Sequence, residues 1–396
     1  MKILISGLVL LLLLFFPSGL ENTDKNTGID PVVEVSFNFV GDLMVHSVQR
    51  QYACEDSIYK IYNFNPSFSE ISEILSSADF TAGNLETVVS DSIPFSGYPR
   101  FNAPKQFLSA LKNAGFDMLY VANNHMQDHG SEGIEQTIEN IRSEGIFPSG
   151  FRENGDTSRN VQIMNVKGIK TAFLAYTYGT NLGYSKKNAK YRVNRIDSAA
   201  IVNDIKTADE NGAELITVYF HFGNEYERKE NKFQRKIEKI AKSAGADIIL
   251  ASHPHVLQPV EIYASEKGRI DSGFTVYSMG NFISNQRWRY SDCGVVINFS
   301  VIKDLITGKL RLKEVKYLPV WVYKGNTGDG YRFVVIPKIS GHKKDYPGYL
   351  TEDDFKLMQQ SFDDTEKILT KYTGRIKQYK ISGKRKNNLA AGYNNF

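Results

Sequence analysis

The stretch ADIILASHPH at residues 246–255 decides the fold class of this chain. Its apolar run Ile248–Ala251 is typical of a buried β-strand, and histidines follow the strand on both sides of Pro254. The preceding residues, Lys232–Ala244, have the apolar spacing of an amphipathic helix, and Gly245 ends it. A helix that leads into a buried strand with polar residues at its end is typical of α/β layering.

The same alternation of helix and strand extends in both directions from this stretch. Further strands are expected at Val33–Val40, Asp79–Ala82, Met118–Ala122, Val161–Val166, Thr171–Tyr176, Glu214–Phe220 and Phe274–Ser278. Further helices are expected at Phe68–Ala78, Ala103–Ala114, Ser131–Glu144 and Ser198–Asn211. The C-terminal third predicts a meander and one late helix, at Val295–Val301, Leu310–Tyr317, Phe333–Ile336 and Thr351–Lys371.

The N-terminus has the layout of a secretory signal, because Met1-Lys2 precedes the apolar run Ile3–Phe16. As a helix the run rises only about 21 Å, against about 30 Å for a hydrocarbon core, which favours a cleaved signal over a retained N-terminal anchor. We therefore predict a signal peptide over 1–20, a linker over 21–31 and a main domain over 32–325. Residues 326–396 are expected to form a C-terminal extension with a helix and a basic tail.

Composition and charge exclude several classes of protein. With 41% apolar residues the chain can bury a full core, which excludes disorder throughout. The net charge of +4 is spread along the chain, so it shows no nucleic-acid footprint and no nucleic-acid partner is expected. The only cysteines, Cys54 and Cys293, lack metal-finger spacing, and the sequence leaves open whether they form a disulfide or remain buried thiols.

Six polar residues come directly after predicted strands, at the edge where α/β sheets collect ligand sites: Asp42, Glu86, Asn124, His221, His253 and His255. Each alone has a structural explanation, such as a turn residue, a helix cap or a hydrogen-bonded histidine. We expect Pro254 to hold its segment extended, so that the flanking imidazoles project to similar sides. Imidazole nitrogens with carboxylate and amide oxygens suit Zn, Mn or Fe, and the set exceeds the needs of one ion. The sequence therefore predicts two divalent metal ions in a hydrolase-type site.

The order of motifs resembles the bacterial capsule synthesis (CapA, poly-gamma-glutamate) family, whose domain is similar to calcineurin-like metallophosphoesterases. The resemblance covers most of residues 33–285. It lies in GDLM at 41–44, ADFTAGNLETVVS at 78–90, FNAPKQFLSALKNAGFDMLYVANNHMQDHG at 101–130, HFGNEY at 221–226, ADIILASHPHVLQPVE at 246–261 and YSMGNFI at 277–283. The resemblance implies an α/β fold of the metallophosphatase-like kind, a layered α-β-β-α sandwich with motif loops at strand ends.

The resemblance also implies roles for individual residues. It places Asp42 and His255 on one metal, and Glu86 as the bridge between the metals. It places Asn124, His221 and His253 on the other metal, with His125 as a nearby proton donor. His46 lies four residues after Asp42 and would complete the first metal's set if that segment is helical. Contacts to the ligands or the substrate are expected from Asn84, Asp128, Glu225, Asn281 and Phe282.

Two functions remain open from the sequence. In the first, the metals activate water for attack on a phosphoester or amide, and His125 protonates the leaving group. In the second, an exported accessory protein binds or guides an anionic polymer for export without turnover. Both hypotheses expect an anionic envelope polymer or its precursor as partner, near a membrane-bound polymer synthesis complex at the periplasmic or extracellular face. The chain has Met44 and Glu86 where classical phosphoesterases carry histidine and aspartate, so the resemblance does not by itself transfer phosphatase activity.

Overall fold

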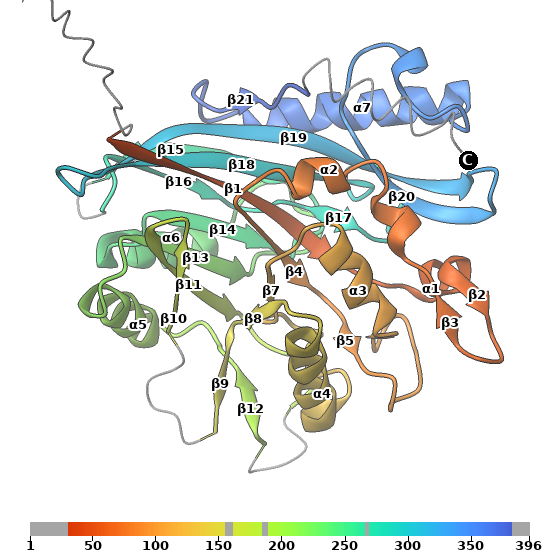
Figure 1. Cartoon of the computed structure of the whole chain (residues 1–396), viewed down its shortest axis with the longest axis horizontal. Helices are drawn as coiled ribbons and strands as arrows, with labels where there is room; N and C mark the ends of the chain where they lie inside the picture. Colours follow the sequence, from red (N-terminus) through yellow and green to blue (C-terminus); the bar gives the residue numbers. More distant parts are fainter. Residues whose placement is uncertain (1–30, 155–160, 184–188, 266–268, 382–396) are drawn as a thin grey trace, which may run out of the picture. The chain divides into compact units, whose positions relative to one another are not determined.

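Two β-sheets carry most of the strands in the computed structural model, which describes residues 31–154, 161–183, 189–265 and 269–381 (Figure 1). The predicted signal peptide, the linker up to residue 30 and the end of the basic tail lie outside the described residues. The larger sheet has nine strands, in the order β20-β19-β18-β1-β4-β7-β8, with β17 beside β1 and β21 beside β19. The smaller sheet has six strands, in the order β10-β11-β13-β14-β16-β15.

The bounds of these strands follow the predicted alternation. The larger sheet contains β1 (Val32–Leu43), β4 (Phe80–Leu85), β7 (Met118–Tyr120), β8 (Phe147–Ser149), β17 (Asn281–Ile283), β18 (Cys293–Asp304), β19 (Leu310–Asn326), β20 (Tyr331–Pro337) and β21 (Lys377–Gln378). The smaller sheet contains β10 (Gln162–Val166), β11 (Ile169–Thr177), β13 (Leu215–His221), β14 (Ile248–Ser252), β15 (Val260–Ala264) and β16 (Ser272–Val276). Short pairs form from β2 (Cys54–Asp56) with β3 (Ile61–Tyr62), β5 (Val88–Val89) with β6 (Asn102–Ala103), and β9 (Phe151–Glu153) with β12 (Tyr191–Val193).

The main apolar core lies between the two sheets. The ring of Phe80 on β4 stacks on Phe173 of β11, with centroids 4.5 Å apart. Tyr120 at the end of β7 stacks on Tyr219 of β13 at 4.6 Å. All four rings are buried, and such pairs stabilise beyond the area they bury. The aromatic side chains therefore fix how one sheet faces the other.

Helices cover the outer faces of the sheets (Figure 1). The helices are α1 (Ser47–Ala53), α2 (Ser72–Leu75), α3 (Gln106–Asn113), α4 (Gly130–Ser143), α5 (Ser198–Glu210), α6 (Lys232–Ala244) and α7 (Glu352–Leu369). Helices α5 and α6 pack their apolar faces on the smaller sheet, through residues such as Ile201 and Ile237. Helix α7 packs Met358 and Phe362 on Trp321 of β19. The predicted layered α-β-β-α sandwich, with its C-terminal meander and helix, is confirmed.

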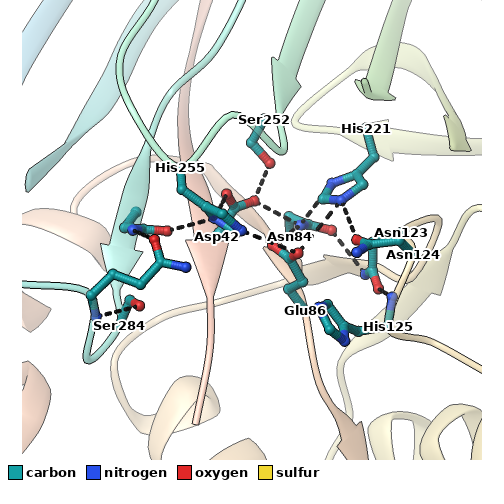
Figure 2. Close-up of polar contacts among 12 residues, drawn as sticks. Asp42, Asn84, Glu86, Asn123, Asn124, His125, His221, Ser252, His255 and Ser284 are labelled. Atoms are coloured by element: carbon teal, nitrogen blue, oxygen red, sulfur yellow. Dashed lines mark hydrogen bonds and ion pairs between the residues drawn. The ribbon is translucent and has the colours of Figure 1, made fainter. Parts of the chain in front are cut away.

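Parallel pairing explains where the site lies. Strands β1, β4, β7 and β8 run parallel in the larger sheet, and β11, β13, β14 and β16 run parallel in the smaller one. Parallel neighbours place their carboxyl ends at one edge of a sheet, so the residues that follow each strand gather there. The two sheets bring these edges together, and the polar residues after the strands meet (Figure 2).

Some elements differ from the sequence-based expectation. The predicted helix Phe68–Ala78 is only a 3₁₀ turn over Asn65–Phe68 and the short α2, in a segment whose four serines favour turns and caps over a helix interior. The predicted boundary at residue 325 falls inside β19, and β20 extends the same sheet.

Both cysteines are free thiols. Among the described helices, none has the length and apolar character needed to cross a membrane.

Candidate metal centre

Two glycines let Asp42 reach the centre of the site. Asp42 N donates to Gly280 O at 3.0 Å, where β1 meets β17. A Cβ atom on Gly41 would lie 1.9 Å from Gly280 O, so only glycine fits there. The predicted loops that carry GDLM and GNFI therefore lie side by side, and Asn281 pairs with Asp42 across the two strands.

Two groups of three residues each bring their possible metal-binding atoms close together. Glu86, His221 and His253 form one group, and Asp42, Glu86 and His255 form the other, with the ligand atoms of each group within 4.8 Å of one another. All five side chains are buried. Glu86 belongs to both groups, and its Oε1 lies 3.6 Å from His221 Nε2 and 3.9 Å from His255 Nε2 (Figure 2). The arrangement thus has one shared carboxylate between two sets of donors.

Asn124 joins the first of these groups. Its Oδ1 lies 2.7 Å from His221 Nε2, while its Nδ2 donates to Asn181 Oδ1 at 3.3 Å. The amide is therefore turned so that its oxygen points toward the histidines. Oxygen and imidazole nitrogen donors meet here in the mixture that the sequence predicts.

Several buried atoms of the two groups lack a hydrogen bond. Among the described residues, no partner satisfies Asp42 Oδ2, Glu86 Oε1 or His253 Nδ1. Asp42 Oδ2 does lie 3.2 Å from His255 Nδ1, but that nitrogen is also 3.0 Å from Asn281 Oδ1. Unsatisfied buried polar atoms are costly, and three of them in one cluster fit the binding of cations. The donor set fits divalent ions with affinity for both nitrogen and oxygen.

Burial controls the protonation of the cluster. Burial first, then the nearby Asp42 carboxylate, raises the pKa of Glu86 well above its usual value. Burial also lowers the pKa of His253 to about 3 and, together with the charge of His253, lowers the pKa of His221 well below its usual value. Burial acts to raise the pKa of Asp42, but contacts with His255 and Ser252 outweigh it, and the net shift is downward. Neutral imidazoles are ready to bind a metal at neutral pH.

The His-Pro-His segment is not extended, contrary to the expectation. His253 has φ of 112° and His255 has φ of 57°, both in the region that side chains rarely adopt. Backbone strain of this kind costs about 1–3 kcal/mol per residue and is found at ligand sites. The bends, rather than an extended Pro254, direct one imidazole to each group, with ring centroids 6.1 Å apart.

A buried chain of hydroxyl groups supports Asp42, and the sequence did not single it out. Ser252 Oγ makes a short hydrogen bond to Asp42 Oδ1, and Tyr219 OH makes a short contact with Ser252 Oγ. Because Oδ1 is held in this way, Oδ2 is left to face His255. Strand periodicity offered a signal for Tyr219, since it lies two residues before His221 on the same face of β13.

Amides link the ends of the β1, β4 and β7 strands beneath the donors. Asn84 Nδ2 donates to Asp42 Oδ1 at 2.8 Å, and its Oδ1 accepts from Asn123 Nδ2 at 3.1 Å. Asn123 also donates to Leu85 O at 2.7 Å, and its Oδ1 accepts from the amide of His125 at 3.2 Å. Asn84 therefore contacts Asp42, one of the residues predicted to bind a metal. Asn123 was missed, although it directly precedes Asn124 in the motif.

His125 and Asp128 form a pair at the edge of the cluster. His125 Nδ1 lies 2.7 Å from Asp128 Oδ2, which also accepts the amide of Phe101 at 2.8 Å. The ring of Phe101 meets the His125 ring edge to face at 4.7 Å. Both Asp128 and Phe101 are fully buried, so they hold the imidazole in one orientation.

The remaining candidates lie outside the two donor groups. His46 precedes α1, where its Nδ1 is 3.0 Å from Gln49 Oε1 and accepts the amide of Asn285. Asn281 contacts His255, as described above, whereas Phe282 is fully buried against Phe116 in the core and has no surface for a substrate. Glu225 is exposed, and its charge reaches Glu86, whose pKa it helps to raise.

Comparisons with known proteins match this chain to proteins of capsule synthesis. A family model described as bacterial capsule synthesis protein PGA_cap matches residues 36–286. The capsule biosynthesis protein CapA of Bacillus anthracis is 29% identical over 272 residues, which make up 66% of this chain and 63% of that protein. The PGA biosynthesis protein CapA of Bacillus subtilis (strain 168) is 27% identical over 300 residues, 74% of each chain. The chain thus spans less than two thirds of the B. anthracis protein.

Among solved structures, the NAD nucleotidase NadN of Haemophilus influenzae is similar over 92% of this chain and 67% of its own length. Its sequence identity is 14% and its TM-score is 0.45.

Proposed function

Because the chain belongs to the bacterial capsule synthesis protein PGA_cap family, as its motifs predicted, we propose that it is an exported, metal-dependent hydrolase of envelope-polymer synthesis. One observation carries the proposal. Glu86 is shared by two groups of buried donors, as a carboxylate that bridges two metal ions would be. The substrate in this proposal is an envelope polymer or its precursor, cleaved at a phosphoester or amide bond.

The residues present fit two divalent ions. Asp42, His255 and Glu86 would hold one ion, and Glu86, Asn124, His221 and His253 would hold the other. When bound, such a pair of ions lowers the pKa of water and stabilises negative charge on the attacked centre. Mn, Zn and Fe all suit this mixture of donors.

His125 provides the proton in the proposed reaction. Asp128 accepts a hydrogen bond at Nδ1 of His125, so the proton to be donated is on Nε2. Phe101 packs on the ring and limits its rotation. A positioned acid of this kind typically contributes about 10²- to 10⁴-fold to the rate, because the leaving oxygen or nitrogen departs protonated.

Export rests on the sequence of the N-terminus. Met1-Lys2 and the apolar run Ile3–Phe16 are typical of a secretory signal. We therefore propose action on the outer side of the cytoplasmic membrane, where envelope polymers are assembled. The partner in that setting is a membrane-bound polymer synthesis complex. Fractionation of cells that express the full chain, with the mass of the mature protein, tests this part separately.

The experiment for catalysis compares metal-depleted protein with protein reloaded with Mn²⁺ or Zn²⁺. We expect reloaded protein to hydrolyse p-nitrophenyl phosphate or bis(p-nitrophenyl) phosphate, and the Asp42→Ala and His253→Ala variants to lose that activity. Full activity in both variants would refute the metal-dependent mechanism. Tight binding of poly-gamma-glutamate without turnover, retained in His125→Ala, would instead favour an accessory role that binds or guides an anionic polymer.

A further inference from the structure

Four partly exposed aromatic side chains are connected to the histidines of the metal centre. Tyr178 is 43% exposed and Tyr226 is 44% exposed, while Trp288 and Tyr98 reach 51% and 78%. Large aromatic rings are usually more buried, and a cluster of exposed ones marks a binding surface. We name these four residues the aromatic rim.

Two sides of the aromatic rim each contact a different histidine. The ring of Tyr178 lies 4.6 Å from that of His253, and the ring of Tyr226 lies 6.0 Å from that of His255. Trp288 extends this second side, because its ring is 5.3 Å from Tyr226.

Tyr98 forms the third side of the rim and is linked to the site through the buried ring of Phe101. The ring of Tyr98 lies 6.4 Å from that of Phe101, and the ring of Phe101 lies 4.7 Å from that of His125. A molecule bound at the donors would therefore meet aromatic rings on several sides.

Charge also bears on what the rim can bind. The exposed carboxylate of Glu225, next to Tyr226 in the chain, repels a chain of carboxylates. Aromatic faces are themselves electron-rich and attract polarised C–H groups rather than anions. An uncharged ring is thus a better occupant than a polyanion.

The tilt of the rings distinguishes between two kinds of uncharged ring. A flat base is best held between parallel aromatic planes, but the planes of Tyr226 and Trp288 are 64° apart. A sugar ring presents C–H groups in several directions and can meet rings of different tilt. The exposed Glu225 carboxylate, at the same opening, can accept hydrogen bonds from sugar hydroxyl groups.

We propose that the aromatic rim binds a sugar ring of the substrate, next to the group held at the metal centre. The substrate class is therefore a sugar phosphoester or a phosphate-linked glycan. This inference rests on the proposed function, since it places the cleavable group at the metals. It goes further in naming what lies beside that group.

Tryptophan fluorescence gives a direct test, because the chain has two tryptophans and only Trp288 is exposed, whereas Trp321 is fully buried. Mn²⁺-loaded full-length protein is titrated with N-acetylglucosamine 1-phosphate, with glycerol 1-phosphate as a ringless control and with inorganic phosphate. Calorimetry of the same titrations gives the dissociation constants. We expect a fluorescence change and about tenfold tighter binding for the sugar phosphate, corresponding to about 1.4 kcal/mol.

Variants separate the rim from the metal centre. Tyr178→Ala and Tyr226→Ala should each reduce the ratio of sugar-phosphate affinity to inorganic-phosphate affinity by about fivefold, a loss typical of one stacking contact. Tyr226→Phe should keep the preference, because the ring remains. Tyr59→Ala is the matched control, since Tyr59 is 77% exposed near the turn between β2 and β3.

The outcomes distinguish the two proposals. Equal affinity for sugar phosphate and glycerol 1-phosphate would overturn the sugar site alone. Tighter binding of adenosine 5′-monophosphate than of the sugar phosphate would replace the sugar by a base, and would also overturn it. Failure of every phosphate probe, inorganic phosphate included, would count against the metal-centred function itself.

Discussion

The Nδ1 atom of His125 lies 2.7 Å from the Oδ2 atom of Asp128. Asp128 fixes the tautomer and orientation of the imidazole, and Phe101 closes its other side. The pair lies beside the donor cluster but supplies no atom to it. Its role is therefore separable from metal binding by experiment.

Asp128→Asn should lower kcat by at least about tenfold without changing metal content, because the amide no longer holds the imidazole in the productive tautomer. The loss should be larger for phenyl phosphate than for p-nitrophenyl phosphate, whose leaving group needs less protonation. Steady-state kinetics with both esters provides the measurement. Equal losses on the two esters would show that His125 is not an acid in the reaction.

Ser252→Ala should weaken Mn²⁺ binding by about tenfold, because Asp42 loses the hydroxyl that holds its Oδ1. Tyr219→Phe should give a smaller loss in the same direction, since Tyr219 acts through Ser252. Calorimetric titration of metal-depleted protein provides the measurement. Ser361→Ala on α7 is the control, a buried serine on the outer layer, and an equal loss there would remove the special role of Ser252.

Gly41→Ala should destabilise the fold by about 2 kcal/mol or more, because the new Cβ would clash with Gly280 O. The clash separates β1 from β17, so metal affinity should fall together with stability. Denaturant unfolding gives the free energy of unfolding of each variant. Gly374→Ala is the control, because a Cβ atom there would have open space. A Gly41→Ala protein as stable as the wild type would contradict the close approach of these two loops.

Acid should destabilise the metal-free protein through His253, whose pKa burial lowers to about 3 from 6.5. Below pH 6.5 the unfolded chain binds a proton on His253 that the folded chain excludes. The free energy of unfolding therefore falls by up to about 1.4 kcal/mol per pH unit. The loss begins as pH drops through 6.5 and continues toward 3.

Urea unfolding at about pH 7 and about pH 5 should therefore show a larger loss for the wild type than for His253→Gln. Glu86 has a raised pKa, so its protonation stabilises the folded protein as the pH falls. Because wild type and variant share this effect, the difference between them isolates His253. The same pH dependence in wild type and variant would mean that His253 is not held neutral by burial.

Much of the fold was predictable because its signals are local. The run Ile248–Ala251 and the helix Lys232–Ala244 form as expected, since apolar periodicity reports burial directly. The Phe68–Ala78 helix was wrong because its four serines favour turns and caps over a helix interior, which the apolar spacing alone does not report. Short strands such as β5 and β6 have too few residues to show a period.

The site was predictable in its members but less so in its geometry. The donors lie at the ends of strands or just beyond them, and parallel pairing brings strand ends together, so Glu86 and His221 could be expected to meet. The positive φ values of His253 and His255 have no signal in residue type, because they arise from tertiary contacts. For the same reason, Ser252 could not be distinguished from an ordinary strand residue, whereas Tyr219 had only its shared face with His221 as a signal.

Phe282 and His46 show the limit of motif position as a guide to role. Phe282 alternates with the site-facing Asn281 along β17 and so points into the core. His46 is engaged by Gln49 and Asn285, outside the two donor groups.

Metal analysis of the purified protein tests the central claim most directly. After dialysis against Mn²⁺ and removal of free metal, elemental analysis should find two ions per wild-type chain. Glu86→Ala should hold one ion or none, because both donor groups lose their shared carboxylate. A wild-type protein that binds no more than one ion, or a Glu86→Ala variant that still binds two, would contradict the account.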